Sequence, residues 1–371
     1  MTEPLDIFLA APPGLEPVLA AEAAAAGFAD PAPQPGGVAI RGDWAEVRRA
    51  NLMLRGAGRV LVRIGGFRAF HLAQLDKRAR KFPWGDFLRA DVPVRVEATC
   101  KGSRIYHHKA AAQRIETALR EALGVEIAAD APIRLLARID DDFCGFSLDA
   151  SGEPLHKRGH KEAVGKAPMR ETLAALFLRA CGYDGAEPLV DPMCGSGTFP
   201  IEAAEIAAGL APGRTRPFAF EQFATHDAKA WAAEKQAAGV AAPEGPARFI
   251  GSDRDQGVIG MAKANAERAG VGGLCEFIRR PVSDLARPDG PPGLVIVNPP
   301  YGARIGEVPK LRPLYGTLGE ALKAGFSGWR VGLITTEAPL ARAAGLPFLP
   351  PGPPVAHGGL KVKLFRTEPL P

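Results

Sequence analysis

The chain has 371 residues, of which 46% are hydrophobic and 23% are charged, and its formal net charge is +5. This composition excludes a wholly disordered or collagen-like chain and predicts a globular protein with room for two or three domains. The apolar stretch 15–28 contains Glu16 and Glu22 and follows two prolines, which excludes a secretion signal or a membrane span there and predicts a cytoplasmic protein.

The first 150 residues alternate between strand and helix patterns. Residues 4–45 predict a small βαβ-like unit, with strands at 6–10 and 37–41, a helix at 15–26 and a loop at 31–37. The elements expected after it are a helix at 44–54, a strand at 59–67, a helix near 72–81, a strand at 92–99, a helix at 108–123, and strands at 133–140 and 142–149.

Positive charge is concentrated in this part of the chain. Residues 41–120 contain 18 Lys and Arg against 7 Asp and Glu, a local net charge of +11, so that the remaining residues together carry −6. Such a segment attracts a phosphate backbone, because each neutralised phosphate releases condensed counterions. A solvated arginine-rich surface is the alternative interpretation, and charge alone does not decide between the two.

Beyond residue 156, longer helices alternate with short apolar strands that end in Asp or Asn. This alternation predicts a parallel, doubly wound α/β sheet, and we place the domain boundary near residues 150–165. A proline-rich loop at 347–354 precedes a last strand at 360–366. The earlier strands are expected at 189–190, 248–250, 276–278, 294–297 and 331–335.

The strand at 189–190 leads into a glycine-rich turn, because residues 189–198 read LVDPMCGSGT. Glycines there allow positive φ and let a ligand approach the backbone. The lysine of a triphosphate-binding loop is missing, and Pro200 interrupts a GxGxxG dinucleotide pattern. An acid at the strand end suits a ligand with an ammonium group, such as the methionine part of S-adenosylmethionine, although a purely structural turn remains the alternative. The candidate cofactor contacts are Asp191, Met193, Gly195, Gly197 and Thr198.

Two further acids follow the next strands. Asp253 is placed to accept hydrogen bonds from ribose hydroxyls, and Asp255 is expected near the cap of a helix at 257–269. Asp284 is a candidate acceptor for an adenine amino group, with a surface loop residue as the alternative.

The strand at 294–297 ends in the NPPY motif, Asn298–Tyr301. The two prolines hold the backbone extended just past a strand end, where ligands bind in open α/β sheets. The Asn298 amide oxygen, which is also a candidate cofactor contact, and the Pro299 carbonyl are therefore two close acceptors for an exocyclic amine, and Tyr301 offers a stacking face. A rigid strand-to-loop turn is the alternative for the motif taken alone. Its occurrence together with the Asp191 turn strengthens the functional interpretation.

Together, these two motifs resemble the class I S-adenosylmethionine-dependent amino-methyltransferases. Nearly the whole chain is similar to the RlmL type of THUMP-domain RNA guanine-N2 methyltransferases. The segments that carry the likeness are 14–19 (GLEPVL), 94–98 (VRVEA), 104–108 (RIYHH), 155–160 (LHKRGH), 167–172 (APMRET), 298–306 (NPPYGARIG) and 314–319 (LYGTLG).

The resemblance implies a Rossmann-like methyltransferase domain at 156–371, preceded by a ferredoxin-like part at 1–45, completed by the segment after it, and a THUMP-type RNA-binding domain at 46–155. It implies methyl transfer from S-adenosylmethionine to the exocyclic N2 of a guanosine in RNA, most of all 23S ribosomal RNA, by a monomer without a metal. The longer relatives carry a second methyltransferase domain, for which 371 residues leave no room, so one modification is expected. The candidate RNA contacts are Arg95, Lys101, Arg104, Lys109 and Arg304.

Four interpretations stay open at this point, three substrates for an enzyme and one role without catalysis. Because NPPY specifies an amino nitrogen and not a polymer, the substrate is either ribosomal RNA, the guanosine N2 of a tRNA, or the adenine N6 of DNA. A non-catalytic RNA-binding ribosome assembly factor is the remaining candidate.

Cysteine and histidine carry little of the expected chemistry. The five cysteines lie far apart without a CxxC pair, so neither a disulfide framework nor a zinc site is expected. Cys194 is expected to be a small packing residue and not a nucleophile. His107 and His108 are expected to start a helix on a basic face and not to bind a metal.

Overall fold

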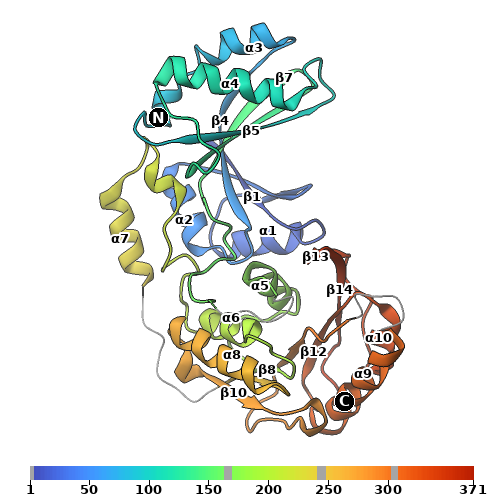
Figure 1. The fold of residues 1–371 in the computed structure, drawn as a ribbon. Helices are drawn as coiled ribbons and strands as arrows, with labels where there is room; N and C mark the ends of the chain where they lie inside the picture. The colour runs from blue at the N-terminus through green and yellow to red at the C-terminus, as the bar shows by residue number, and fades with distance from the viewer. Residues whose placement is uncertain (1–3, 163–168, 240–247, 302–307) are drawn as a thin grey trace.

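The computed structural model describes residues 4–162, 169–239, 248–301 and 308–371, which form two large β-sheets with helices packed on them (Figure 1). The N-terminal sheet has the strand order β2-β3-β1-β4-β7-β6-β5, and the C-terminal sheet has the order β10-β9-β8-β11-β12-β14-β13. The elements of the first half are β1 (Leu5–Ala10), α1 (Glu16–Ala25), β2 (Ala32–Gln34), β3 (Gly37–Gly42), α2 (Trp44–Met53), β4 (Arg59–Arg68), α3 (Leu72–Ala79), β5 (Val94–Lys101), α4 (His108–Leu123), β6 (Ile133–Asp140) and β7 (Phe143–Asp149).

The first unit differs from the expected βαβ arrangement. β1 and β3 pair in antiparallel register, Ile7 opposite Ile40, because the segment expected as a loop contains the edge strand β2, which pairs with β3. Gly36 has a φ of 84° in the turn between β2 and β3. Pro33 is tolerated in β2 because an edge strand has a row of backbone groups that needs no partner.

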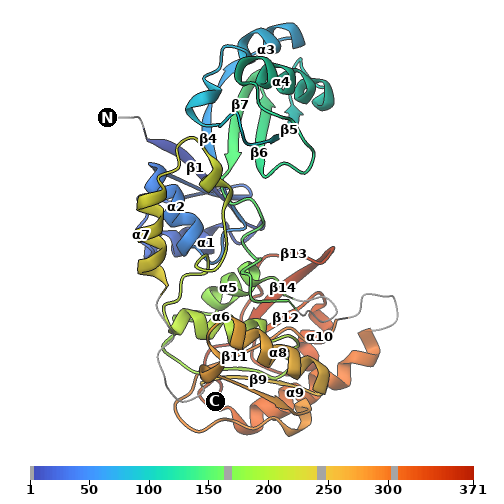
Figure 2. The same ribbon diagram turned by 60° about the vertical axis from the view of Figure 1, so that its left-hand side comes forward.

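The rest of the N-terminal sheet continues directly from this unit. β4 pairs with β1 on one side and with β7 on the other. One sheet therefore runs through both of the domains expected before and after residue 45. The division of the chain at that residue stays a prediction. β5 and β6 pair in parallel. Helices α3 and α4 pack on each other above this end of the sheet (Figure 2).

The C-terminal sheet positions the candidate site. Its strands β10, β9, β8, β11 and β12 are parallel, as expected, but the antiparallel β14 and the unexpected β13 complete one edge. The elements of this half are α5 (Glu171–Ala180), β8 (Leu189–Asp191), α6 (Thr198–Ala207), α7 (Ala228–Ala238), β9 (Phe249–Asp253), α8 (Gln256–Arg268), β10 (Cys275–Arg279), β11 (Leu294–Val297), α9 (Val308–Gly325), β12 (Arg330–Thr335), α10 (Ala338–Ala343), β13 (Val355–His357) and β14 (Leu360–Arg366).

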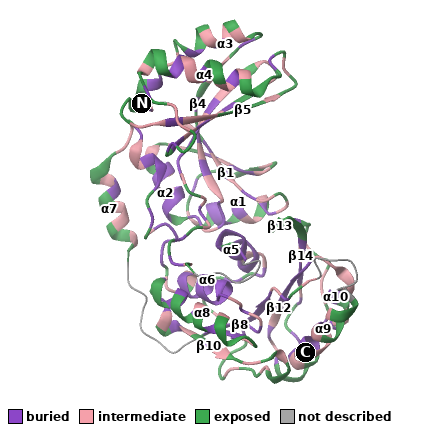
Figure 3. Cartoon of the chain, viewed as in Figure 1, coloured by how far each residue is buried: buried purple, intermediate pink, exposed green. Residues whose placement is uncertain are grey.

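The two halves are joined through buried helices and buried charges. Helix α5 is covered by α1 on one side and by α6 on the other, and Figure 3 shows it almost entirely buried. Helix α7 lies beside α2, where Arg48 pairs with Glu234 at 2.7 Å. Arg55 pairs at 2.9 Å with Glu202 on α6, whose side chain is only 1% exposed. No helix in the part of the chain that the structure describes is both long enough and apolar enough to cross a membrane.

Candidate active site

A cleft of about 770 Å³ opens where β8, β9 and β11 end at the carboxyl edge of the C-terminal sheet. This is the edge at which open α/β sheets bind ligands. β11 lies next to β8 in the sheet, which brings the NPPY motif beside the glycine-rich turn. The lining residues are Met169, Asp191, Met193, Cys194, Gly195, Ser196, Thr198, Phe199, Asp253, Arg254, Asp255, Val258 and Asn298–Tyr301.

Two glycines shape the turn between β8 and α6. Gly195 has a φ of 51° and Gly197 a φ of 86°, a region that disfavours other residues. A Cβ atom on Gly197 would lie 3.0 Å from both Ala262 and Phe277, so this glycine also permits close packing of the turn. Gly195 faces the cleft, whereas Gly197 caps α6 behind it and is not a lining residue.

Three acids line the cleft, Asp191, Asp253 and Asp255. Asp191 is 2% exposed and accepts a hydrogen bond from the Met193 N–H at 3.1 Å. Burial raises the pKa of the Asp191 carboxyl to about 8, and the negative charge of Asp253 adds to the shift. Asp253 accepts from the backbone N–H of Gly195 at 3.2 Å and of Asp255 at 3.0 Å, and so ties the ends of β8 and β9 together.

Asp255 caps α8, as expected, by accepting from the Gly257 N–H at 2.7 Å. Asp284 lies elsewhere: it is exposed in a short 3₁₀ turn, Val282–Asp284, accepts from the Ser283 hydroxyl and does not line the cleft. Its contact with an adenine stays a prediction. Arg304 lies outside the described residues.

The NPPY motif closes the cleft on the side of β11. The Asn298 Oδ1 atom is buried and has no hydrogen-bond partner within the described chain. A buried acceptor without a partner is uncommon, and none of the described residues supplies a donor to it. Tyr315, on α9, is fully buried and donates from its hydroxyl toward the Pro300 carbonyl at 3.3 Å or the Thr335 hydroxyl at 3.2 Å, which holds the motif in place.

Sequence reasoning missed several residues of the site. Met169 lines the cleft from the segment just before α5, and Arg254 lines it from the turn after β9. Met169 belongs to the segment 167–172 that carries the family likeness, although the sequence does not single it out as a cofactor contact. Arg254 belongs to no motif, so only the folded chain places it in the cleft. Cys194 lies in the cleft wall, and burial raises the pKa of its thiol, which disfavours the thiolate and agrees with a packing role.

The candidate RNA contacts do not form one cluster. Lys101, Arg104 and Lys109 are exposed at the end of β5 and the start of α4. Arg95 lies near the opposite end of β5, six residues from Lys101 and hence about 20 Å away along the strand. His107 caps α4 by accepting from the Ala110 N–H, and no group of three or more metal-ligating side chains occurs within the described ranges.

Several arginines of the basic stretch have structural partners. Arg48 and Arg55 are turned toward the C-terminal half, and Arg59 pairs with the buried Asp149. These three side chains hold the fold together and are not available to a nucleic acid. The count of 18 basic residues therefore overstates the charge that this surface offers to RNA.

Two family models match the chain. Residues 158–347 match the RMKL-like methyltransferase domain, and residues 6–61 match the RlmL ferredoxin-like domain. The first match covers about half of the chain and includes every element that lines the cleft.

Relatives with ribosomal names match both halves. A protein named "Ribosomal RNA large subunit methyltransferase K/L" from Syntrophotalea carbinolica is 39% identical over 367 residues, which cover 93% of this chain and 51% of that protein. The protein of the same name from Chromohalobacter salexigens is 36% identical, with coverages of 93% and 50%. The chain thus spans about half the length of these curated relatives.

A solved structure agrees with the fold over nearly the whole length. The crystal structure of a protein described as a predicted N6-adenine-specific DNA methylase from Listeria monocytogenes superposes with a TM-score of 0.86 at 30% identity, covering 98% of this chain and 96% of that one. The sequence matches and the shared fold lead to one conclusion: the chain belongs to the family of RMKL-like methyltransferase domains and carries an RlmL ferredoxin-like domain before it.

Proposed function

We propose that this protein transfers a methyl group from S-adenosylmethionine to the exocyclic N2 of a guanosine in RNA, with large-subunit ribosomal RNA as the substrate. The observation that carries the proposal is the buried Asn298 Oδ1 atom, which lines an acidic cleft and has no hydrogen-bond partner among the described residues. The names of the ribosomal relatives support the choice of polymer, although the chain spans only about half their length.

The residues of the cleft fit the methyl donor. Asp191 is an acid at a strand end, where it suits a cationic ammonium, and Asp253 lies at the next strand end, where it suits ribose hydroxyls. The glycine-rich turn leaves the backbone open between them. When bound, S-adenosylmethionine supplies an electrophilic methyl group that an amine attacks without a strong base.

The NPPY motif then positions the acceptor base. The Asn298 amide oxygen and the Pro299 carbonyl accept the two N–H groups of the exocyclic amine, which aligns its nitrogen with the methyl group, while Tyr301 stacks on the ring. An amine inside a duplex cannot reach this cleft, so the target nucleotide is unpaired or flipped out. Lys101, Arg104 and Lys109 hold the RNA backbone by shape and charge.

The decisive experiment identifies the methylated nucleoside. The protein and radiolabelled S-adenosylmethionine are incubated in three separate reactions with ribosomal RNA, tRNA or DNA. The nucleic acid from each reaction is then digested to nucleosides. Labelled N2-methylguanosine from ribosomal RNA is the expected result. N2-methylguanosine from tRNA alone, or N6-methyl-2′-deoxyadenosine from DNA, would replace the proposed substrate. DNA is a necessary arm because the Listeria structure is described as a predicted N6-adenine-specific DNA methylase.

A pair of variants separates chemistry from binding. Asn298→Ala should abolish methyl incorporation and leave RNA affinity nearly intact, because its amide faces the cleft and not the basic surface. Arg104→Glu should weaken RNA binding. It should also lower the slope of log affinity against log salt concentration by about one, the value expected for the loss of one phosphate contact. Equal losses of both properties in the Asn298 variant would refute its assigned role. No binding of S-adenosylmethionine by the native protein would favour the assembly-factor alternative.

A further inference from the structure

A single lysine joins the two walls of the cofactor cleft from behind. The Lys161 Nζ atom donates to the Thr198 hydroxyl at 2.8 Å and to the Met169 carbonyl at 2.9 Å. Both of these residues line the cleft, whereas Lys161 itself lines only a small cavity behind it. Thr198 begins α6 and Met169 precedes α5, so one ammonium group connects two elements that meet at the cleft.

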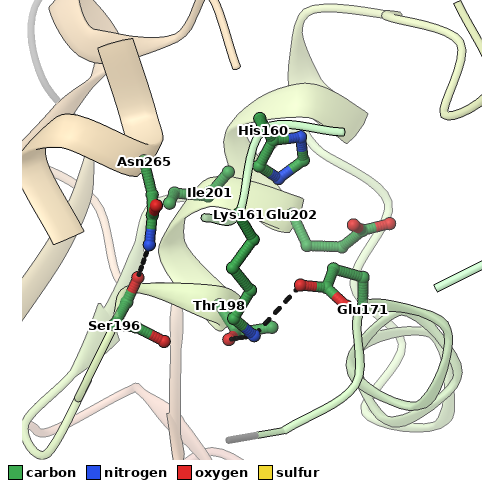
Figure 4. Close-up of a pocket in the computed structure, with 8 residues that line it drawn as sticks. All are labelled: His160, Lys161, Glu171, Ser196, Thr198, Ile201, Glu202 and Asn265. Carbon is green, nitrogen blue, oxygen red and sulfur yellow. Dashed lines mark hydrogen bonds and ion pairs between the residues drawn. The ribbon is translucent and has the colours of Figure 1, made fainter. Parts of the chain in front are cut away.

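The Lys161 side chain is largely buried, and its contact partners are buried. The Lys161 side chain is 11% exposed and pairs at 3.0 Å with Glu171, which is 6% exposed. The ammonium group thus makes two hydrogen bonds and one ion pair to buried partners, and Figure 4 shows its contact with Glu171 beside Thr198. An exposed ion pair of a lysine contributes little to stability. Removing a buried lysine is costly, because its former partners stay buried without a donor.

The segment that carries Lys161 also holds the N-terminal half. Arg158, three residues earlier, pairs with Glu202 at 3.2 Å and donates to the Arg55 carbonyl at 2.9 Å. Glu202 lies one turn beyond Thr198 on α6 and pairs with the Arg55 guanidinium as well. The segment Leu155–Glu162, the connector, therefore touches the N-terminal half and both walls of the cleft.

We propose that Lys161 is a positioning residue for the methyl donor: it fixes the Thr198 end of the glycine-rich turn against the Met169 backbone and so sets the width of the cofactor cleft. This inference rests on the proposed function, because it assigns the cleft to S-adenosylmethionine. It assigns Lys161 no contact with the donor or with the reacting atoms.

The test measures binding and local opening. Lys161→Met should weaken the binding of S-adenosylmethionine in isothermal titration calorimetry roughly 10- to 100-fold, the range expected for losing a hydrogen bond from a charged donor. Hydrogen exchange of the turn that follows β8 should become faster in the ligand-free variant, while RNA affinity changes less than about twofold. Lys157→Met is the matched control, because Lys157 lies in the same connector but is 61% exposed and pairs only with Glu153 at the surface.

A double variant keeps the test decisive if Lys161→Met is unstable. Lys161→Met with Glu171→Gln removes the unpaired carboxylate, so it should regain thermal stability but not donor affinity. Recovery of both would overturn the proposal, because the lysine would then only neutralise Glu171. Wild-type donor affinity in a folded Lys161→Met variant would also overturn it.

Failure of the proposed function gives a different pattern. If the protein binds S-adenosylmethionine but methylates no nucleic acid, the proposed function is refuted. The donor affinities of the Lys161 and Lys157 variants still test the role of Lys161 in that case. A native protein that does not bind S-adenosylmethionine overturns both.

Discussion

The buried carboxyl of Asp191 makes binding of the methyl donor depend on pH. Burial raises its pKa from 3.8 to about 8, with a further contribution from Asp253, so the ligand-free protein holds a proton on Asp191 at neutral pH. The ammonium group of S-adenosylmethionine favours the ionised carboxylate. Binding therefore releases that proton, and affinity rises as the pH rises toward 8.

The size of the effect follows from the pKa. At pH 6 only about 1% of the ligand-free protein has an ionised Asp191, and at pH 7.5 about a quarter does. If only the ionised form binds, the apparent Kd falls about 25-fold between these two values. The donor's own amino group keeps most of its charge over this interval, because an α-amino pKa is about 7.7–8.0.

Isothermal titration calorimetry at both pH values, in two buffers of different ionisation enthalpy, measures the Kd and the protons released together. The native protein should release close to one proton per donor bound at pH 6. Asp191→Asn should bind more weakly at pH 7.5 and lose the pH dependence, because an amide does not titrate. A Kd of the native protein that is constant between pH 6 and pH 7.5 would refute the reasoning. So would an Asp191→Asn variant whose Kd changes with pH as much as that of the native protein.

Three substitutions test the supporting structure. Tyr315→Phe removes the hydroxyl that holds the NPPY motif and should lower kcat about fivefold, measured by methyl incorporation, with an unchanged donor Kd in calorimetry. Arg55→Met leaves Glu202 short of a buried partner and should lower the free energy of unfolding by about 3 kcal/mol in urea titration; no change would show that Arg158 alone satisfies this acid. Gly319→Ala places a methyl group against the Ala344 carbonyl and should cost about 2 kcal/mol, seen as a lower melting temperature.

The sequence predicted elements best where local signals agree. Helix α4 begins and ends as expected at His108 and Leu123, because His107 supplies a cap and Gly124 adopts a left-handed φ of 74°. The edge strand β2 escaped prediction because its three residues, with a proline at the centre, read as a loop, and only pairing with β3 makes them a strand.

The candidate site was predictable for a topological reason. Asp191, Asp253 and Asn298 each follow an apolar strand, and parallel strands bring their carboxyl ends to one edge whatever their order in the chain. Asp284 follows the outermost strand, β10, in sequence, but its 3₁₀ turn packs on α9 and leaves the Asp284 side chain exposed outside the cleft. The path of the chain after β10, which a single sequence does not reveal, separates Asp284 from the other acids.

The basic stretch shows what a charge count leaves out. An arginine contributes to RNA binding only when its guanidinium is free to meet a phosphate, and burial against an acid from another part of the chain removes that freedom. Arg48 and Arg55 meet Glu234 and Glu202 of the other half, contacts that span well over a hundred residues and carry no local signal. Part of the positive charge in the first third of the chain therefore fixes the N-terminal half to the C-terminal half. The position of the basic surface relative to the cleft of the C-terminal sheet therefore depends on these two arginines.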